Sequence, residues 1–280
     1  MCPLKFDLDR RSLETLFSSF VASTMFYGIE VWGGTYDSHL LKLEQIVVDG
    51  MRLVCGATKR SNILKLYEDT GWQSVKERRD QAMVIMLYKI KHNIAPTYLH
   101  QLLPQDQPYV HNIRSKKDIR EMRFNTEIFK RSFFPTAVRL WNSLDRETQN
   151  SGSINILRNK LRGAKEKPTL YYYGKRWPAI HHARLRIGCS KLNYHVCFNL
   201  HIPDVSPDCS CGEGYENSEH FLMECKLYND IRNTLKRKIE RHCIFTLDVL
   251  LHGAQDLPLN TNYALFDAVH EYILESHRFE

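Results

Sequence analysis

Residues 40–54 have the sequence LLKLEQIVVDGMRLV, and they indicate the fold class more clearly than any other stretch. Apolar side chains recur there at mostly three- and four-residue steps, as on one face of an α-helix: Leu40, Leu43, Ile46, Val47, Met51 and Val54. Gly56, a residue type that commonly ends helices, follows. The stretch therefore predicts an amphipathic helix with one apolar face buried.

The same periodicity recurs on both sides of this stretch. We expect further helices within 13–24, 75–90, 99–103, 133–144, 154–161, 228–239, 247–251 and 264–273. Such stripes could form a groove for a partner, but the core of a small helical bundle is their commoner role. The predicted fold class is therefore mainly α.

Composition fits an ordinary globular protein. The chain has 280 residues, of which 43% are hydrophobic and 25% charged, so global disorder and a collagen-like fold are excluded and about two domains are expected. The most apolar early stretch, 16–32, contains four hydroxyl residues and Glu30, so no membrane span is expected. A polar N-terminus and irregularly spaced cysteines favour a reducing location, nuclear or cytoplasmic rather than secreted.

The net charge of +7 is concentrated in one segment. Residues 1–150 contain 22 Lys and Arg against 17 Asp and Glu, residues 151–200 contain 10 against 1, and residues 201–280 contain 7 against 14. The three net charges are therefore +5, +9 and −7. A basic segment of this density suggests an anionic partner.

Aromatic residues are interleaved with the cations of this segment. Cations neutralise phosphates, and aromatic faces stack on unpaired bases, so we expect RNA or DNA binding. The alternative is a solvated helix face followed by a Tyr-rich buried strand. The expected contact residues are Arg158, Lys160, Arg162, Lys165, Lys167, Tyr172, Lys175, Arg176, Trp177, Arg184, Arg186 and Lys191.

The strongest chemical signal lies downstream of the basic segment. Cys209 and Cys211 are separated by one residue, and His220 and Cys225 follow within 17 residues in all. Three thiolates and one imidazole satisfy a tetrahedral structural zinc ion. The alternative is two reduced cysteines, a surface histidine and a core cysteine. Further residues could extend or replace the ligand set: His181, His182, Cys189, His195 and Cys197.

Motifs for catalysis are missing from the sequence. There is no Gly-rich phosphate loop, no dinucleotide-binding turn, no nucleophile elbow and no pair of adjacent aspartates that could hold two metal ions. We therefore expect no enzyme activity from the chain on its own.

Three segments together resemble a known family. Residues 183–195 (ARLRIGCSKLNYH), 206–212 (SPDCSCG) and 219–228 (EHFLMECKLY) are similar to the C-terminal tail of the reverse transcriptase of non-LTR (LINE-type) retrotransposons. Residues 27–33 (YGIEVWG), with the helix at 40–55, resemble the thumb helices of that enzyme. Residues 133–144 (FFPTAVRLWNSL) resemble the segment between thumb and tail, so the resemblance covers residues 10–240.

Breaks in the sequence divide the chain into four consecutive segments, and the resemblance implies their roles. Residues 1–104 would form a helical thumb-like bundle, 105–150 a basic linker and connecting helix, 151–200 the basic aromatic stretch, and 201–280 a small zinc-bound helical tail. Cys209, Cys211, His220 and Cys225 would be the zinc ligands of a CCHC motif, and the basic stretch would hold template RNA or target DNA. Cys189 departs from the family pattern, which more usually has His there.

The parts of the parent enzyme that carry out chemistry are not included in the resemblance. The palm with its catalytic aspartates, and the endonuclease, would lie before residue 1, so RNA-directed DNA polymerase activity cannot be transferred to this chain. A different interpretation is a protein-interaction scaffold with a structural zinc site and no nucleic-acid role. In that case the acidic 201–280 segment would contact the basic 158–191 stretch.

Overall fold

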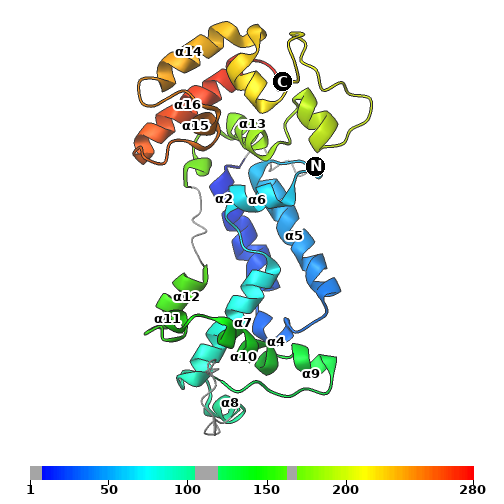
Figure 1. The fold of residues 1–280 in the computed structure, drawn as a ribbon, viewed down its shortest axis with the longest axis vertical. Coiled ribbons are helices and arrows are strands. Elements are labelled where there is room, and N and C mark those ends of the chain that lie inside the picture. Colours follow the sequence, from blue (N-terminus) through cyan, green and yellow to red (C-terminus); the bar gives the residue numbers. More distant parts are fainter. Residues whose placement is uncertain (1–7, 105–118, 163–168) are drawn as a thin grey trace. The chain divides into compact units, whose positions relative to one another are not determined.

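The protein is mainly helical, as the sequence predicts. The computed structural model describes residues 8–104, 119–162 and 169–280 (Figure 1). Over these ranges there is no β-strand, and one isolated antiparallel bridge joins Asp208 to Tyr215. Among the described helices, none combines the length and the apolar character that a membrane crossing requires.

The chain divides into two compact units, each made of segments distant in sequence. Unit 1 comprises Met1–Val21, Val48–Trp72 and Glu166–Glu280, and unit 2 comprises Ala22–Val47 and Gln73–Lys165. Segments distant in sequence meet within unit 1, where Arg10 and Arg186 both bind the buried Asp69.

Unit 2 is a bundle around one long helix. Its helices are α3 (Ser23–Met25), α4 (Ile29–Trp32), α7 (Val75–Lys91), α8 (Thr97–Gln101), α9 (Glu127–Arg131), α10 (Phe133–Ser143), α11 (Arg146–Gln149) and α12 (Ile154–Arg162). A capping box of Ser74 and Glu77 begins α7, which packs against α4, α10 and α12. Met83, Leu87 and Trp141 are fully buried between them, so the periodicity predicted for 75–90 and 133–144 is confirmed.

Unit 1 contains the remaining described elements. They are α2 (Arg10–Leu16), the π-helix η1 (Phe17–Ala22, whose last residue falls in unit 2), α6 (Ile63–Thr70), η2 (Thr169–Tyr172), α13 (Arg176–Ile187), η3 (His195–Asn199), η4 (His220–Glu224), η5 (Lys226–Tyr228), α14 (Asn229–Ile239), α15 (Leu247–His252) and α16 (Leu259–Glu275). Helix α13 contacts α6, α15 and α16, and α14 packs on α16. Phe221, Val269 and Tyr272 are the centre of this core, as expected for 264–273.

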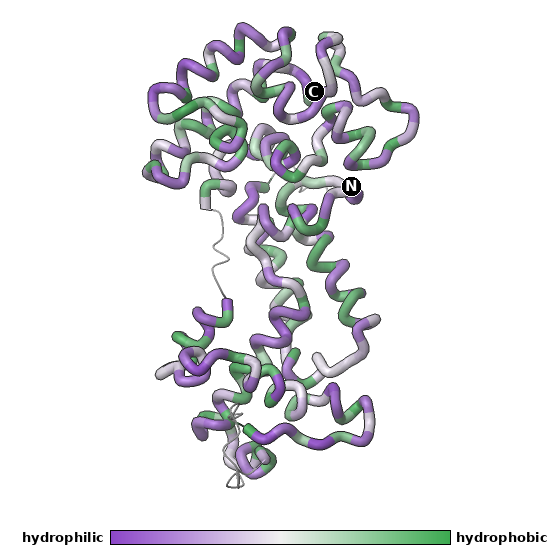
Figure 2. Tube along the Cα trace, viewed as in Figure 1, coloured by the Kyte–Doolittle hydropathy of each residue, from purple (hydrophilic) through white to green (hydrophobic). Residues whose placement is uncertain are grey.

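Helix α5 (Asp37–Cys55) confirms the helix predicted from residues 40–54, but not every residue of its face. Figure 2 shows hydrophobic and hydrophilic residues interleaved along it. Met51 and Val54 are buried as expected, whereas Ile46 is 44% exposed and Val48 is buried instead. The first part of α5 belongs to unit 2 and the last part to unit 1, so its buried residues do not follow a single face.

The stripe predicted for residues 13–24 is wrong in part. Leu13 is buried, but Leu16 and Val21 are about two-fifths exposed and Phe20 is 72% exposed. Residues 17–22 are π-helical, and the extra residue in each π turn rotates the following side chains away from the face that an α-helix would keep.

The basic aromatic stretch differs from the alternative interpretation of its sequence, a solvated helix face followed by a Tyr-rich buried strand. Tyr171 and Tyr172 lie in a 3₁₀ turn, not in a strand. The residues that follow form α13, in which Pro178 occupies the first turn and Gly188, with φ of 76°, ends the helix. Most of α13 is buried, so this helix lies in the core of unit 1 rather than on a solvated face.

Candidate metal centre

A tight turn brings the first two cysteines of the predicted ligand set together. The Cys209 amide donates to the Gly214 carbonyl at 2.8 Å, and the Gly212 amide donates to the Cys209 carbonyl at 2.9 Å. Gly212 and Gly214 have φ of 78° and 138°, in the region that strongly favours glycine. The turn therefore requires glycines at these two positions to hold Cys209 beside Cys211.

A π-helical turn supplies the other two ligands. The side chain of Asn217 accepts from the His220 amide at 2.7 Å, and the Cys225 amide donates to the His220 carbonyl at 2.7 Å. The turn η4 thereby closes at Cys225 and places this residue next to His220.

The four side chains converge on one point. All ligand atoms of Cys209, Cys211, His220 and Cys225 lie within 4.8 Å of one another, and all four residues are buried. The two closest pairs are Cys209 Sγ to Cys225 Sγ at 3.6 Å and Cys211 Sγ to His220 Nε2 at 3.2 Å. A tetrahedral zinc ion requires about 3.8 Å between sulfurs and about 3.6 Å between sulfur and nitrogen. The predicted cluster is therefore confirmed as a candidate metal site of suitable size.

Neighbouring groups fix the ligands in place. Glu224 Oε2 lies 3.4 Å from His220 Nδ1, so that Nε2 faces the cluster, and the Glu213 amide donates to Cys211 Sγ at 3.3 Å. Arg232, buried in α14, donates to the carbonyls of Cys225 and, at 3.2 Å, of Leu222. The position of Cys225 therefore depends on α14.

The three thiols of the cluster differ in their pKa. Burial and the neighbouring thiols raise the pKa of Cys209 to about 12, and burial likewise raises the pKa of Cys225. For Cys211, burial opposes ionisation, but hydrogen bonds from the Glu213 amide and the adjacent side chains lower its pKa to about 7. A divalent cation among the sulfurs stabilises all three thiolates together.

The other cysteines and histidines considered as ligands are not part of this cluster. His181 stacks on Phe279 and lies tilted against Trp177, with ring centroids 4.8 and 4.4 Å away. His182 Nε2 lies 2.9 Å from the Leu250 carbonyl oxygen, and His195 Nδ1 lies 2.7 Å from Ser190 Oγ. Cys189 and Cys197 also lie outside the cluster. Within the described ranges, the extended ligand set is therefore not formed.

Arg186, one of the expected nucleic-acid contacts, is the partner of a buried aspartate. Its Nε donates to Asp69 Oδ1 at 2.8 Å, and Arg10 donates to Asp69 Oδ2 at 2.8 Å. The thiol of Cys55 completes the group at 3.2 Å from Asp69. Burial opposes ionisation of Asp69, but the two guanidinium groups lower its pKa to about 2. Arg186 therefore stabilises unit 1 internally.

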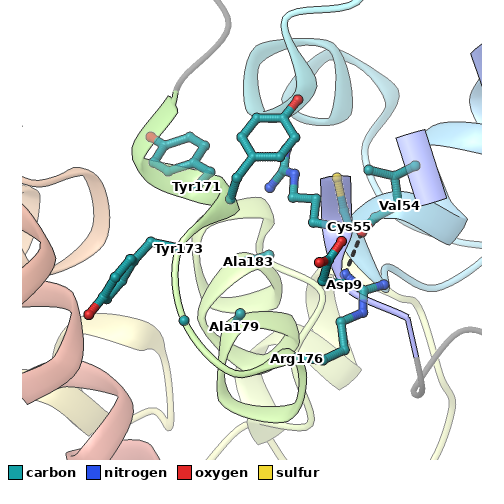
Figure 3. A pocket seen from close by; sticks show the side chains of 11 residues that line it. Asp9, Val54, Cys55, Tyr171, Tyr173, Arg176, Ala179 and Ala183 are labelled. Atoms are coloured by element: carbon teal, nitrogen blue, oxygen red, sulfur yellow. Dashed lines mark hydrogen bonds between the residues drawn. The ribbon is translucent and has the colours of Figure 1, made fainter. Parts of the chain in front are cut away.

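Two more of the expected contact residues bind the end of α5. Arg176 donates to the carbonyls of Leu53 and Val54 at 3.0 and 2.7 Å, and Arg184 donates to the Gly56 carbonyl at 2.8 Å. Figure 3 shows Arg176, with its bond to Val54, among the side chains that line a small cavity of unit 1. Cations suit this position because the last carbonyls of a helix lack partners within it.

The remaining expected contacts differ in their availability. Four of them have partners within the chain. Tyr172 donates to Glu14, and Trp177 is half-buried against the core. Lys160 pairs with Glu147 at 2.7 Å, and Lys191 donates to the Phe279 carbonyl at 2.8 Å. Arg158, Arg162 and Lys175 are exposed. Arg158, Lys160 and Arg162 belong to unit 2 and the others to unit 1, while Lys165 and Lys167 lie outside the described residues.

One supporting residue could have been identified from the sequence. Arg232 lies at helical spacing with Tyr228, Leu235 and Ile239, and therefore on the buried stripe of the predicted helix. A cation on such a stripe indicates a buried acceptor nearby, here the Cys225 carbonyl. Asp69 gave no comparable signal, because the positions of its two arginine partners depend on the tertiary fold.

Comparisons with protein-family models, with curated proteins and with solved structures find no significant match to this chain.

Proposed function

We propose that this chain is a non-catalytic module that binds RNA or DNA and is stabilised by one structural zinc ion. The observation that carries the proposal is the closed set of Cys209, Cys211, His220 and Cys225, buried and within 4.8 Å of one another. Zinc, when bound, would supply the cross-link between the 209–214 turn and the end of η4, which precedes α14. A buried site with four protein ligands leaves no open position for a substrate, which fits a structural role.

Nucleic-acid binding is supported by the charge pattern and by the family resemblance. Residues 151–200 contain 10 Lys and Arg against one acidic residue, and their neighbours resemble the tail of a LINE-type reverse transcriptase. Since Arg176, Arg184 and Arg186 are bound within unit 1, the expected phosphate contacts are Arg158, Arg162 and Lys175. These three exposed cations would make sequence-independent contacts to the backbone.

The proposal includes the absence of polymerase activity and a reducing location. We expect no primer extension by the isolated chain, because the resemblance does not extend to a palm with catalytic aspartates. Three ligand thiols favour the nucleus or the cytoplasm, where cysteines stay reduced.

Metal analysis tests the zinc site. The reduced, purified chain should contain one zinc ion per molecule, and Cys209→Ser should release it. Cys243→Ser is the matched control, because this half-buried cysteine lies outside the cluster. Purified protein that contains no stoichiometric metal would rule the site out.

Fluorescence anisotropy with a labelled single strand tests the nucleic-acid contacts. The affinity should fall steeply between 50 and 200 mM salt, as it does for phosphate contacts. Arg158→Gln combined with Arg162→Gln should weaken binding about tenfold and reduce the salt dependence, whereas Lys59→Gln, an exposed cation outside the basic stretch, should have little effect. Binding that does not respond to salt would refute this part of the proposal.

The internal use of the basic stretch favours one second candidate, a protein-interaction scaffold. Tyr173 donates to Asp267 at 2.7 Å, and Lys191 binds the main chain of Phe279 and Glu280, so part of the stretch contacts the 201–280 segment. If anisotropy detects no strand binding at low salt while zinc is present, the scaffold becomes the better description.

A further inference from the structure

A set of cations in unit 2 lines a cavity of its own. A cavity of about 470 Å³ opens where the turn between α4 and α5 meets α7, α9 and the start of α10. Figure 1 shows α4, α7, α9 and α10 gathered in this part of unit 2. Its lining includes five cations, namely Lys76, Arg79, Lys130, Arg131 and Arg139, and three acidic residues, Asp37, Asp80 and Glu127.

The acidic residues leave two of these cations without a counter-charge. Asp80 pairs with Arg79 at 2.8 Å. Glu127 lies 3.0 Å from Lys130 and 3.7 Å from Arg131. Lys76 and Arg139 are exposed and make no ion pair or hydrogen bond with the described part of the chain. The third carboxylate, Asp37, makes no ion pair with the described residues and also faces this cavity. Five cations and three carboxylates give the lining a net charge of +2, and Lys76 and Arg139 are free to meet a ligand.

Two glycines allow the cavity walls to approach each other. A Cβ on Gly33 would lie 2.7 Å from Cγ of Arg79, and a Cβ on Gly34 would lie 2.4 Å from the carbonyl oxygen of Arg131. A side chain at Gly34 would require the main chain at the end of α9 to shift, and one at Gly33 would require the side chain of Arg79 to move. The turn thus holds cations of α7 and α9 around one space, together with the hydroxyl-bearing Thr35.

We propose that this cavity of unit 2 binds a phosphate group, with Lys76 and Arg139 as the principal contacts. Cations from three helices converge on one space, which suits a ligand with several negatively charged oxygens. A phosphate offers such oxygens, and guanidinium groups bind them with paired hydrogen bonds. The phosphate comes either from a small phosphorylated molecule or from a nucleic-acid backbone.

Calorimetric titration with inorganic pyrophosphate tests the site. The intact chain should bind pyrophosphate, and Lys76→Gln combined with Arg139→Gln should weaken the binding by about tenfold or more. Both residues are exposed, so the double variant should keep the circular dichroism spectrum and the melting temperature of the parent chain. Lys42→Gln, an exposed cation on α5 outside the cavity, is the matched control and should bind like the parent.

Two outcomes would overturn the proposal: no binding of pyrophosphate by the parent chain, or an equal loss in Lys42→Gln. Competition identifies the source of the phosphate. If a phosphodiester oligonucleotide displaces pyrophosphate and a methylphosphonate strand of the same sequence does not, the ligand is a nucleic-acid backbone. If neither displaces it, the ligand is a small phosphate. Both results uphold the site.

The test is independent of the proposed function. Arg158 and Arg162 do not line this cavity, so their double substitution should leave pyrophosphate binding unchanged. Loss of strand binding in that variant, with pyrophosphate binding intact, separates the two sites. Conversely, the double variant Lys76→Gln with Arg139→Gln separates the two sites if it loses pyrophosphate binding and keeps strand binding.

Discussion

The two units bury similar apolar residues but differ in what else they bury. The core of unit 2 is built on Met83, Leu87 and Trp141, which pack α7 against α10. The core of unit 1 around Phe221 and Tyr272 adjoins two polar centres, the Cys/His cluster and the ion pairs of Asp69. In an apolar core, the loss of stability is proportional to the side-chain volume that a substitution removes. In a buried polar centre, the loss of one residue leaves its partners buried and unpaired, which costs several kcal/mol at once. Unit 1 should therefore be the more fragile of the two.

Loss of the metal should produce the largest difference between the units. Cys225→Ser removes a metal ligand but keeps the main-chain carbonyl that Arg232 of α14 binds. Structural zinc contributes on the order of 10 kcal/mol, comparable to the stability of a whole domain, so unit 1 should lose its fold. Hydrogen exchange should show amide protection lost in α14 and α16 but kept in α7 and α10. Equal loss in all four helices would contradict a separate response of the units.

Trp141→Ala tests the apolar core of unit 2 in the same way. Removal of this fully buried ring should lower the free energy of unfolding of unit 2 by roughly 3–5 kcal/mol. Urea denaturation measures the loss, and the zinc content should remain one per molecule. Release of zinc by this variant would show that the cores do not behave independently.

Asp69→Asn tests the second polar centre of unit 1. It leaves two buried arginines without a counter-charge and should cost about 3 kcal/mol. Asp49→Asn, at an exposed i,i+3 pair with Arg52, should cost less than about 1 kcal/mol. Because the two guanidinium groups lower the pKa of Asp69 below its ordinary 3.8 to about 2, its stabilisation is complete above pH 4 and disappears as the pH falls towards 2. A parent chain equally stable at pH 5 and pH 2.5 would contradict this.

Three buried histidines of unit 1 should give a further difference between the units, one that grows with acidity. Burial lowers the pKa of His181 to about 3 and of His270 to about 4, and it also lowers the pKa of His182. The unfolded chain binds protons near pH 6.5 and the folded chain does not, so stability is complete above 6.5 and falls below it. The slope is up to about 1.4 kcal/mol per pH unit for each histidine. Urea denaturation midpoints at pH 7 and pH 5 measure this loss of stability, and equal midpoints at the two pH values would contradict it.

The sequence predicts the helices of unit 2 and the metal cluster because both depend on local spacing. The apolar stripe of α7 and the short spacings among the four ligands in residues 209–225 can both be read directly from the sequence. The role of the basic stretch was not predictable in the same way. The partners of Arg176, Arg184 and Arg186 lie more than 110 residues away, and a cation that binds a helix end has the same sequence signature as one that binds phosphate.

Departures from a regular helical period account for the other differences. The π turns at 17–22 and 220–224 add a residue to each turn, which the periodicity of apolar residues does not reveal. In the first case the predicted face is lost. In the second, the wider turn is what places His220 and Cys225 together.

The spacing of the metal ligands has a consequence for the order of folding. Cys209 and Cys225 are 16 residues apart, whereas the bond from Tyr272 to the Phe221 carbonyl closes a loop of 51 residues. The shorter loop loses less chain entropy on closing, so metal capture should precede docking of α16. During synthesis, residues 209–225 also emerge before α16 exists. Pulsed hydrogen exchange during refolding with zinc should protect the 209–225 loop first, and simultaneous protection of α16 would refute this order.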